Sequence, residues 1–90
     1  MGIIRWSKLS PEKIASAQQE VLQTLFLATE DGEWIVRYAA ITGLHSLGDE
    51  IPEEFLPAIA TKFKEILAKE TEIVVKARIQ LALEQLSDNL

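Results

Sequence analysis

The sequence predicts an all-α fold in which two pairs of antiparallel helices stack side by side in a single domain, residues 1–90. Apolar residues recur every three or four positions in four successive segments, which is the period of one helix face. The connections between those segments are short, and short connections place consecutive helices antiparallel. The second pair of segments also repeats the pattern of the first.

The first helix is expected over residues 11–28. Ser10 precedes it as a favoured N-cap, because its hydroxyl can accept a hydrogen bond from an unpaired amide of the first turn. Pro11 suits the first helical position, where its missing N–H would have no partner anyway. The expected buried face consists of Ile14, Ala17, Val21, Leu25 and Ala28.

The second helix is expected to open near Asp31 and to bury Val36, Ala40, Gly43, Leu44 and Leu47. Gly48 follows the last apolar residue, and a helix that ends in a left-handed conformation favours glycine at that place. We therefore expect this helix to end at Gly48 with a left-handed cap.

The third helix is expected to begin around Pro52, with Phe55, Ile59, Phe63 and Ile66 as its buried face. Pro57 fits only within the first turn, since a proline further inside would kink the helix. The fourth helix is expected from about residue 71, and residues 77–86 have helical character that outweighs the strand propensity of residues 73–75. Its buried face consists of Val75, Ile79, Ala82, Leu83 and Leu86.

The second segment aligns with the fourth when Arg37 is placed on Lys76, and we call this the repeat alignment. It matches charged positions with charged ones and apolar positions with apolar ones, such as Leu47 with Leu86. The first segment aligns with the third in the same way, with Val21 on Ile59. A helix pair that repeats at about this interval, roughly 40 residues, is the HEAT or armadillo period. The prediction is therefore a short right-handed solenoid of two HEAT-like αα-hairpins, residues 10–48 and 49–87, with residues 1–9 as an N-terminal cap or tail.

Two such repeats should be marginally stable, because each pair buries its apolar face against its neighbours and about three are usually needed. Three arrangements would meet this need. The chain could be a fragment of a longer solenoid, it could self-associate through its open ends, or Ile3, Ile4 and Trp6 could cap the first repeat.

Composition excludes several classes of function. The net charge is −5 and the basic residues are scattered, so nucleic-acid binding is not expected. Apolar runs are too short to span a membrane. The chain has no cysteine, which removes thiolate metal sites and cysteine nucleophiles. With a single histidine, His45, no metal site is expected either. His45 titrates near neutrality, which leaves a chemical role open beside the simpler expectation of a surface polar residue.

Residues 33–44 (EWIVRYAAITGL) resemble the second helix of a HEAT-like repeat found in the E/F bilin lyase family of cyanobacteria, which attaches phycobilins to phycobiliproteins. Residues 74–83 (VVKARIQLAL) resemble the next such helix, with Lys76 where arginine is usual. The resemblance covers roughly residues 30–86, and the string WIVRYAAI is its most specific part.

This resemblance implies a domain that binds a phycobiliprotein, a phycobilin such as phycocyanobilin, or both, and orients the bilin for thioether attachment to a cysteine of the acceptor protein. The bilin would be a transient ligand, and no intrinsic cofactor is implied. Family members are several times longer and work as paired subunits, so a companion lyase subunit is an expected partner, and this chain is not expected to hold a complete active site. A cytoplasmic location is expected. The alternatives are a HEAT scaffold that binds only proteins and a unit that self-associates.

The candidate binding site is one face of the two second helices. At about 100° per residue, five residues project together from the second helix: Trp34, Tyr38, Ile41, Thr42 and His45. The fourth helix offers Ile73, Ala77, Gln80, Leu81 and Glu84 at the matching places. Second helices line the concave side of HEAT arrays, so we expect a half-apolar surface on which Trp34, Tyr38, Ile41 and His45 contact the ligand. The alternative is that Trp34 covers the turn and Ile41 packs on a neighbouring repeat.

Acidic residues cluster at residues 30–33, 49–54 and 70–72, where helices start. Acids at helix starts accept amide hydrogen bonds and favour the helix dipole, so capping is expected rather than catalysis or calcium binding. Arg37 and Asp31 recur as Lys76 and Glu70. We expect these charges to form a ladder between neighbouring repeats.

Overall fold

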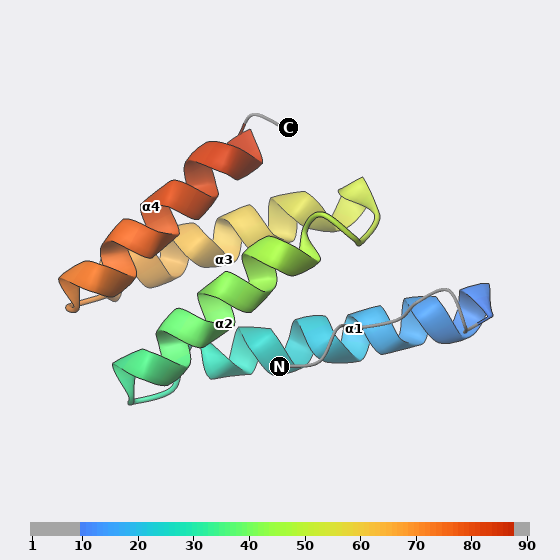
Figure 1. Cartoon of the computed structure of the whole chain (residues 1–90), viewed down its shortest axis with the longest axis horizontal. Helices are drawn as coiled ribbons and strands as arrows, with labels where there is room; N and C mark the ends of the chain where they lie inside the picture. Colours follow the sequence, from blue (N-terminus) through green and yellow to red (C-terminus); the bar gives the residue numbers. More distant parts are fainter. Residues whose placement is uncertain (1–9, 88–90) are drawn as a thin grey trace.

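The computed structural model describes residues 10–87, which form four α-helices joined by short connections (Figure 1). They are α1 (Pro11–Ala28), α2 (Trp34–Leu47), α3 (Leu56–Lys69) and α4 (Ile73–Ser87), with the 3-10 turn η2 (Glu53–Phe55) before α3. No strand occurs among the described residues. The all-α prediction is therefore confirmed. The expected cap of Ile3, Ile4 and Trp6 lies outside the described residues.

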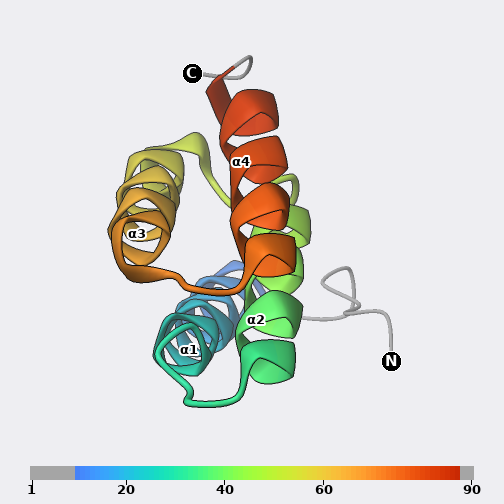
Figure 2. The same cartoon turned by 90° about the vertical axis from the view of Figure 1, so that its left-hand side faces the viewer.

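The helices form two layers, with α1 and α3 on one side and α2 and α4 on the other (Figure 2). α2 packs against α1 within its own hairpin and against α4 of the next, and α3 packs against α4. α2 and α4 thus form the main junction between the two hairpins, as expected for stacked HEAT-like pairs. No helix of the described part is long and apolar enough to cross a membrane.

Short-range hydrogen bonds fix where the helices begin. The Ser10 hydroxyl accepts from the Lys13 N–H at 3.3 Å, as the sequence predicts. Before α2, Asp31 Oδ1 accepts from the Glu33 N–H at 2.8 Å. Pro57 falls in the first turn of α3, where its missing N–H breaks no helical bond.

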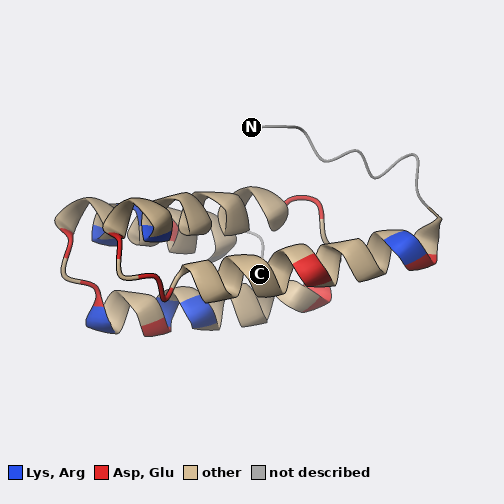
Figure 3. Cartoon of the chain, turned by 90° about the horizontal axis from the view of Figure 1, so that it is seen from below, with Lys and Arg blue, Asp and Glu red and all other residues tan. Residues whose placement is uncertain are grey.

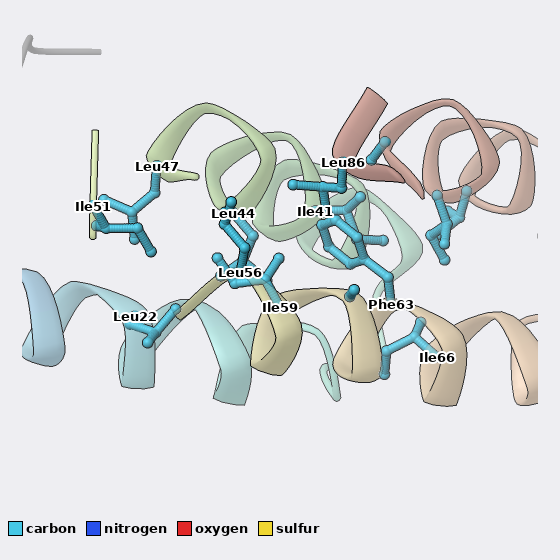
Figure 4. Packing of buried hydrophobic residues seen from close by; sticks show 14 residues of the cluster. Leu22, Ile41, Leu44, Leu47, Ile51, Leu56, Ile59, Phe63, Ile66 and Leu86 are labelled. Carbon is cyan, nitrogen blue, oxygen red and sulfur yellow. The ribbon is translucent and has the colours of Figure 1, made fainter. Parts of the chain in front are cut away.

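A continuous hydrophobic core fills the space between the layers (Figure 4). Ile41 and Leu44 of α2 meet Ile59 and Phe63 of α3 there, and all four side chains are fully buried. The core also takes in Val75 and Ile79 of α4 and Leu22 of α1. Burial of large apolar side chains is the dominant favourable term in folding. Because residues from both hairpins share this one core, neither hairpin buries its apolar face alone.

The predicted left-handed cap at Gly48 is wrong. Its φ is −57° and its ψ −25°, so the chain continues in a right-handed turn in which the Gly48 N–H bonds to the Leu44 carbonyl at 3.0 Å. Glycine is nevertheless suited to the place, because a Cβ there would lie 3.3 Å from the Leu56 side chain. Close approach of α3, rather than backbone conformation, accounts for the glycine.

Two predicted buried faces shift in the structure. Val36 was expected in the core but is 38% exposed, whereas its repeat counterpart Val75 is fully buried. Within its layer α4 has α2 as a neighbour, whereas no described helix lies beside α2 on the side away from α4 (Figure 2). In α1 the expected face is only partly buried, and Gln18 and Leu22 are the residues most buried. Gln18 is accommodated because its side-chain amide donates to the Glu50 carbonyl at 3.2 Å.

Candidate functional site

The predicted site residues lie along the outer surface of α2 and α4, which we call the α2–α4 face. On α2, Trp34 is exposed, and Tyr38, Thr42 and His45 are half-buried. All five predicted residues of α4 are exposed: Ile73, Ala77, Gln80, Leu81 and Glu84. Nine of the ten residues therefore reach this surface.

Ile41 is the exception, and the expectation that it projects from this face is wrong. Its side chain is 0% exposed and belongs to the same core as Leu86 and Phe63, between which it is drawn in Figure 4. Fewer residues of α2 face solvent than the sequence predicts, because α1 and α4 both pack against this helix. The alternative, in which Ile41 packs against a neighbouring repeat, is the correct one.

A polar cluster lies at the centre of the α2–α4 face, where Arg78 of α4 reaches across to α2. Arg78 Nε donates to Thr42 Oγ1 at 3.2 Å, and Nη2 lies 3.0 Å from His45 Nδ1. A guanidinium carries only donors, so His45 Nδ1 must accept, which makes the ring neutral with its proton on Nε2. The third guanidinium nitrogen, Nη1, is buried and has no hydrogen-bond partner among the described residues.

His45 is held in its neutral form by this setting. Burial lowers the pKa of His45 below its ordinary value of 6.5, and the nearby Arg78 guanidinium lowers it further. Asp49 and a hydrogen bond with Gln85 act in the opposite direction but are smaller. At neutral pH His45 is therefore an acceptor for Arg78 rather than a second cation.

Exposed apolar side chains gather at the N-terminal ends of α2 and α4, which lie at the same end of the molecule (Figure 1). Trp34 is 39% exposed and Ile35 63%; their repeat counterparts are more open still, Ile73 at 79% and Val74 at 50%. We call these four residues the apolar end. Exposed apolar groups of this kind often mark a binding surface.

Outside this face, charged residues link the two hairpins. Arg37 binds both oxygens of Glu70, with Nε–Oε1 at 2.8 Å and Nη2–Oε2 at 2.7 Å. The Glu70 side chain is almost fully buried, and hydrogen bonding from Arg37, the largest cause, keeps the pKa of its carboxyl below the ordinary value. Glu70 Oε2 also accepts from the amides of Thr71 and Glu72. The predicted ladder between repeats is confirmed for Arg37 and Glu70.

Glu30 forms the second charged link between the hairpins. It accepts from Lys62 at 2.9 Å and from Lys69 at 2.6 Å, and these hydrogen bonds lower the pKa of Glu30. A cavity of about 280 Å³ opens between these ion pairs, lined by Arg37 and Lys69 among others. Both cations are already paired with carboxylates, so this cavity offers no free charge to a ligand.

The capping predicted for the acidic clusters is confirmed at Asp31 and Glu70, whereas η2 and α3 begin without a side-chain cap hydrogen bond. Figure 3 shows the acidic residues concentrated in the connections between helices. Asp31 and Glu70 accept amide hydrogen bonds just before α2 and α4. Within residues 10–87, no group of three or more metal-binding side chains comes together. Asp31 and Glu70 thus serve helix starts, and Glu30 and Glu70 form ion pairs.

Sequence reasoning missed Arg78, although it occupies the centre of the face. The repeat alignment contains a feature that could have identified Arg78. In the repeat alignment Arg78 falls on Ala39, so a cation appears in the second repeat where the first has a methyl group. Arg78 therefore lies outside the pattern that the two repeats share.

Comparison with known proteins finds several relatives that are phycocyanobilin lyase subunits and one that is a phycobilisome maturation protein. The chain is 42% identical over 85 residues to the phycocyanobilin lyase subunit beta of Nostoc sp., and 42% identical over 69 residues to that of Mastigocladus laminosus. It is 34% identical over 88 residues to a phycobilisome maturation protein of Synechococcus elongatus. These alignments include 94%, 77% and 97% of this chain.

The alignments cover 42%, 63% and 42% of those relatives, so the chain spans between two fifths and two thirds of their length. No protein-family profile matches the chain, and no solved structure matches it. The alignments with the Nostoc and Synechococcus relatives leave out only a few residues of this chain and therefore include the polar cluster and the apolar end. Over nearly its whole length, the chain is homologous to phycocyanobilin lyase subunits.

Proposed function

We propose that this chain is a bilin-handling HEAT-like domain that holds phycocyanobilin on its α2–α4 face. The observation that carries the proposal is the coincidence of two facts. The homology to phycocyanobilin lyase subunits extends through α2 and α4. These two helices present aromatic and apolar side chains around a polar centre. An amphipathic ligand needs such a mixture, since apolar surface supplies affinity and a few polar groups fix orientation.

In this proposal, Trp34 and Tyr38 of α2 contact the flat body of the bilin and His45 contacts its polar part. The chain has no cysteine and therefore cannot be the acceptor of a thioether. Its contribution to attachment would be to orient the bilin toward a cysteine of a phycobiliprotein, which accelerates a reaction by removing the entropy cost of encounter. The rest of the activity would come from a companion subunit or from further repeats, and a cytoplasmic location is part of the same proposal.

The test is a titration of the chain with phycocyanobilin, followed by bilin absorbance and tryptophan fluorescence. Saturable red-shifted absorbance with tryptophan quenching is expected, and Trp34→Ala should abolish both. Leu27→Ala is the matched control, because Leu27 is 76% exposed on α1, away from the face, and its loss should leave binding unchanged. A wild-type chain that gives no spectral change, alone or with a companion lyase subunit, would contradict the proposal.

The apolar end favours a second candidate function, the docking of a protein partner such as a phycobiliprotein subunit. Ile73 is 79% exposed and Val74 50%, which leaves an apolar surface that a protein partner could cover. Ile73→Ser with Val74→Ser should weaken association with that partner in light scattering or sedimentation while bilin binding persists. Loss of bilin binding with unchanged association would assign these residues to the bilin site instead.

A further inference from the structure

The polar cluster of Thr42, His45 and Arg78 departs from the repeat at all three positions. In the repeat alignment, Thr42 falls on Leu81, His45 on Glu84, and Arg78 on Ala39. The charged ladder behaves differently, since Arg37 keeps a cationic counterpart in Lys76. The cluster therefore joins the two hairpins through residue types that the two repeats do not share.

The Arg78 guanidinium is held in place but is incompletely used. Thr42 orients Nε and His45 orients Nη2, while Nη1 is buried and has no partner among the described residues. A buried donor without a partner lowers stability, and such groups in native proteins call for an explanation, of which a ligand is one. Neutral His45 is also a weaker partner than a carboxylate, because hydrogen bonds between two ionised groups are shorter and stronger.

The surroundings of Arg78 restrict the class of ligand. Leu81 lies one turn along α4 from Arg78 and is 46% exposed, and Tyr38 lies one turn along α2 from Thr42 and is half-buried. The chain is acidic overall, with a net charge of −5. Among the three described residues of the polar cluster, Arg78 is the only cation. A polyphosphate would meet too little positive charge here, whereas a mainly apolar molecule with a carboxylate would match both parts of the surface.

We propose that Arg78, oriented by Thr42 and His45, is the carboxylate-binding centre of the α2–α4 face and takes a propionate of an open-chain tetrapyrrole. The planar guanidinium fork suits a carboxylate, with Nη1 and Nη2 each donating one hydrogen bond. Because Nη1 is buried, binding requires the guanidinium to turn toward the surface; the carboxylate then replaces His45 Nδ1 at Nη2 and gives Nη1 its partner. This inference rests on the proposed function, since it assumes that a bilin occupies this face, and it adds the group by which the face would recognise it.

The experiment compares phycocyanobilin with its dimethyl ester, in which both propionates are neutral, by titration of the full chain. The wild type should bind the free acid about tenfold or more tightly than the ester. Arg78→Gln should lower the affinity for the acid to that for the ester and leave the ester's affinity nearly unchanged. Arg78→Lys, which keeps the charge but not the fork, should give an intermediate preference.

Lys76→Gln is the matched control, because it removes the same charge from the same helix on a different side, and it should retain the preference for the acid. Thr42→Val is a second variant, which removes the acceptor that orients Nε and keeps the shape of the side chain; it should reduce the preference if Arg78→Gln does not fold. Equal affinity of the wild type for acid and ester, or an undiminished preference in folded Arg78→Gln, would overturn the inference. Binding of neither form by the wild type would overturn the proposed function itself, and this inference with it.

Discussion

At the scale of single residues, Glu70 shows how one buried carboxylate serves both local and long-range structure. Its Oε2 accepts from the Thr71 and Glu72 amides at 3.1 and 3.0 Å, which fixes the start of α4. The same carboxylate takes both hydrogen bonds from Arg37 of the first hairpin. A buried carboxylate is stable only when its charge is paired and its lone pairs are occupied. Glu70 therefore couples the formation of α4 to its docking on α2.

Arg37→Ala should lower the free energy of unfolding by about 2 kcal/mol, because it leaves the Glu70 charge buried with only its amide donors. In a domain of this size that corresponds to a fall in Tm of roughly 10 °C. Thermal unfolding followed by circular dichroism measures the change. Lys64→Ala, at an exposed position of α3, is the control and should shift Tm little. Equal Tm values for Arg37→Ala and the wild type would show that the ion pair adds nothing.

His45 gives the fold a pH dependence on the acid side of neutrality. Its pKa is below 6.5 in the folded chain, so the unfolded chain binds more protons between these two pKa values. Stability should therefore be complete above about pH 6.5 and decrease as the pH falls through the folded pKa, where a charged ring would face Arg78 with Asp49 as the opposing charge. His45→Gln should flatten this part of a Tm-against-pH curve. An identical slope in wild type and variant would mean that His45 does not titrate differently on folding.

At the scale of helices, the contact between α1 and α2 depends on a residue without a side chain. A Cβ on Gly43 would lie 3.1 Å from Leu25 Cδ2, so the two helices approach closely at this point. The second repeat has Ala82 there, which is fully buried. The two repeats thus have different small residues, glycine and alanine, at matching positions.

Gly43→Ala should leave the free energy of unfolding within about 1 kcal/mol of the wild type, because the gain in helix propensity offsets the adjustment of Leu25. Gly43→Val should destabilise by about 2 kcal/mol, since its extra methyl groups overpack the contact. Chemical denaturation measures both. Gly32→Ala is the control, with no atom within 4 Å of its Cβ, and should change little. A neutral Gly43→Val would indicate that α1 is free to move away from α2.

At the scale of the whole molecule, the two hairpins should unfold together. Phe63 of α3 is fully buried in the same core as Ile41 and Leu44 of α2. Arg37 and Glu30 add ion pairs across the same junction. Repeat proteins gain much of their stability from such interfaces between neighbours. A destabilising substitution in the second hairpin should therefore also lower the stability of the first hairpin.

Phe63→Ala should cost about 3–5 kcal/mol, a large part of the stability of a domain this small. In a Trp6→Phe background, Trp34 fluorescence reports on the first hairpin and circular dichroism on all helices. The two signals should move together to lower denaturant concentration in the variant. A Trp34 transition that stays at its wild-type midpoint would show that the hairpins unfold independently.

Much of the architecture follows from local physical chemistry. The Ser10–Pro11 start, the helical spacing of apolar residues and the short connections specify four antiparallel helices, because capping and periodicity act within a few residues of the chain. The match between the two helix pairs also predicts that they stack. It further identifies the charges of the ladder, of which the structure pairs Arg37 with Glu70.

The candidate site depended on tertiary packing. Nine of its ten residues could be placed on one surface from helical geometry, but Ile41 is buried because α2 is covered from two sides. Val36 is exposed for the opposite reason, since no described helix covers it. Arg78 joins the site only because α4 crosses α2 at a point that brings it to Thr42 and His45, which lie far earlier in the chain. By itself the sequence determined which segments become helices and that they repeat, since those properties are local; which side of each helix faces solvent, and which distant residues meet there, is decided only when the helices pack.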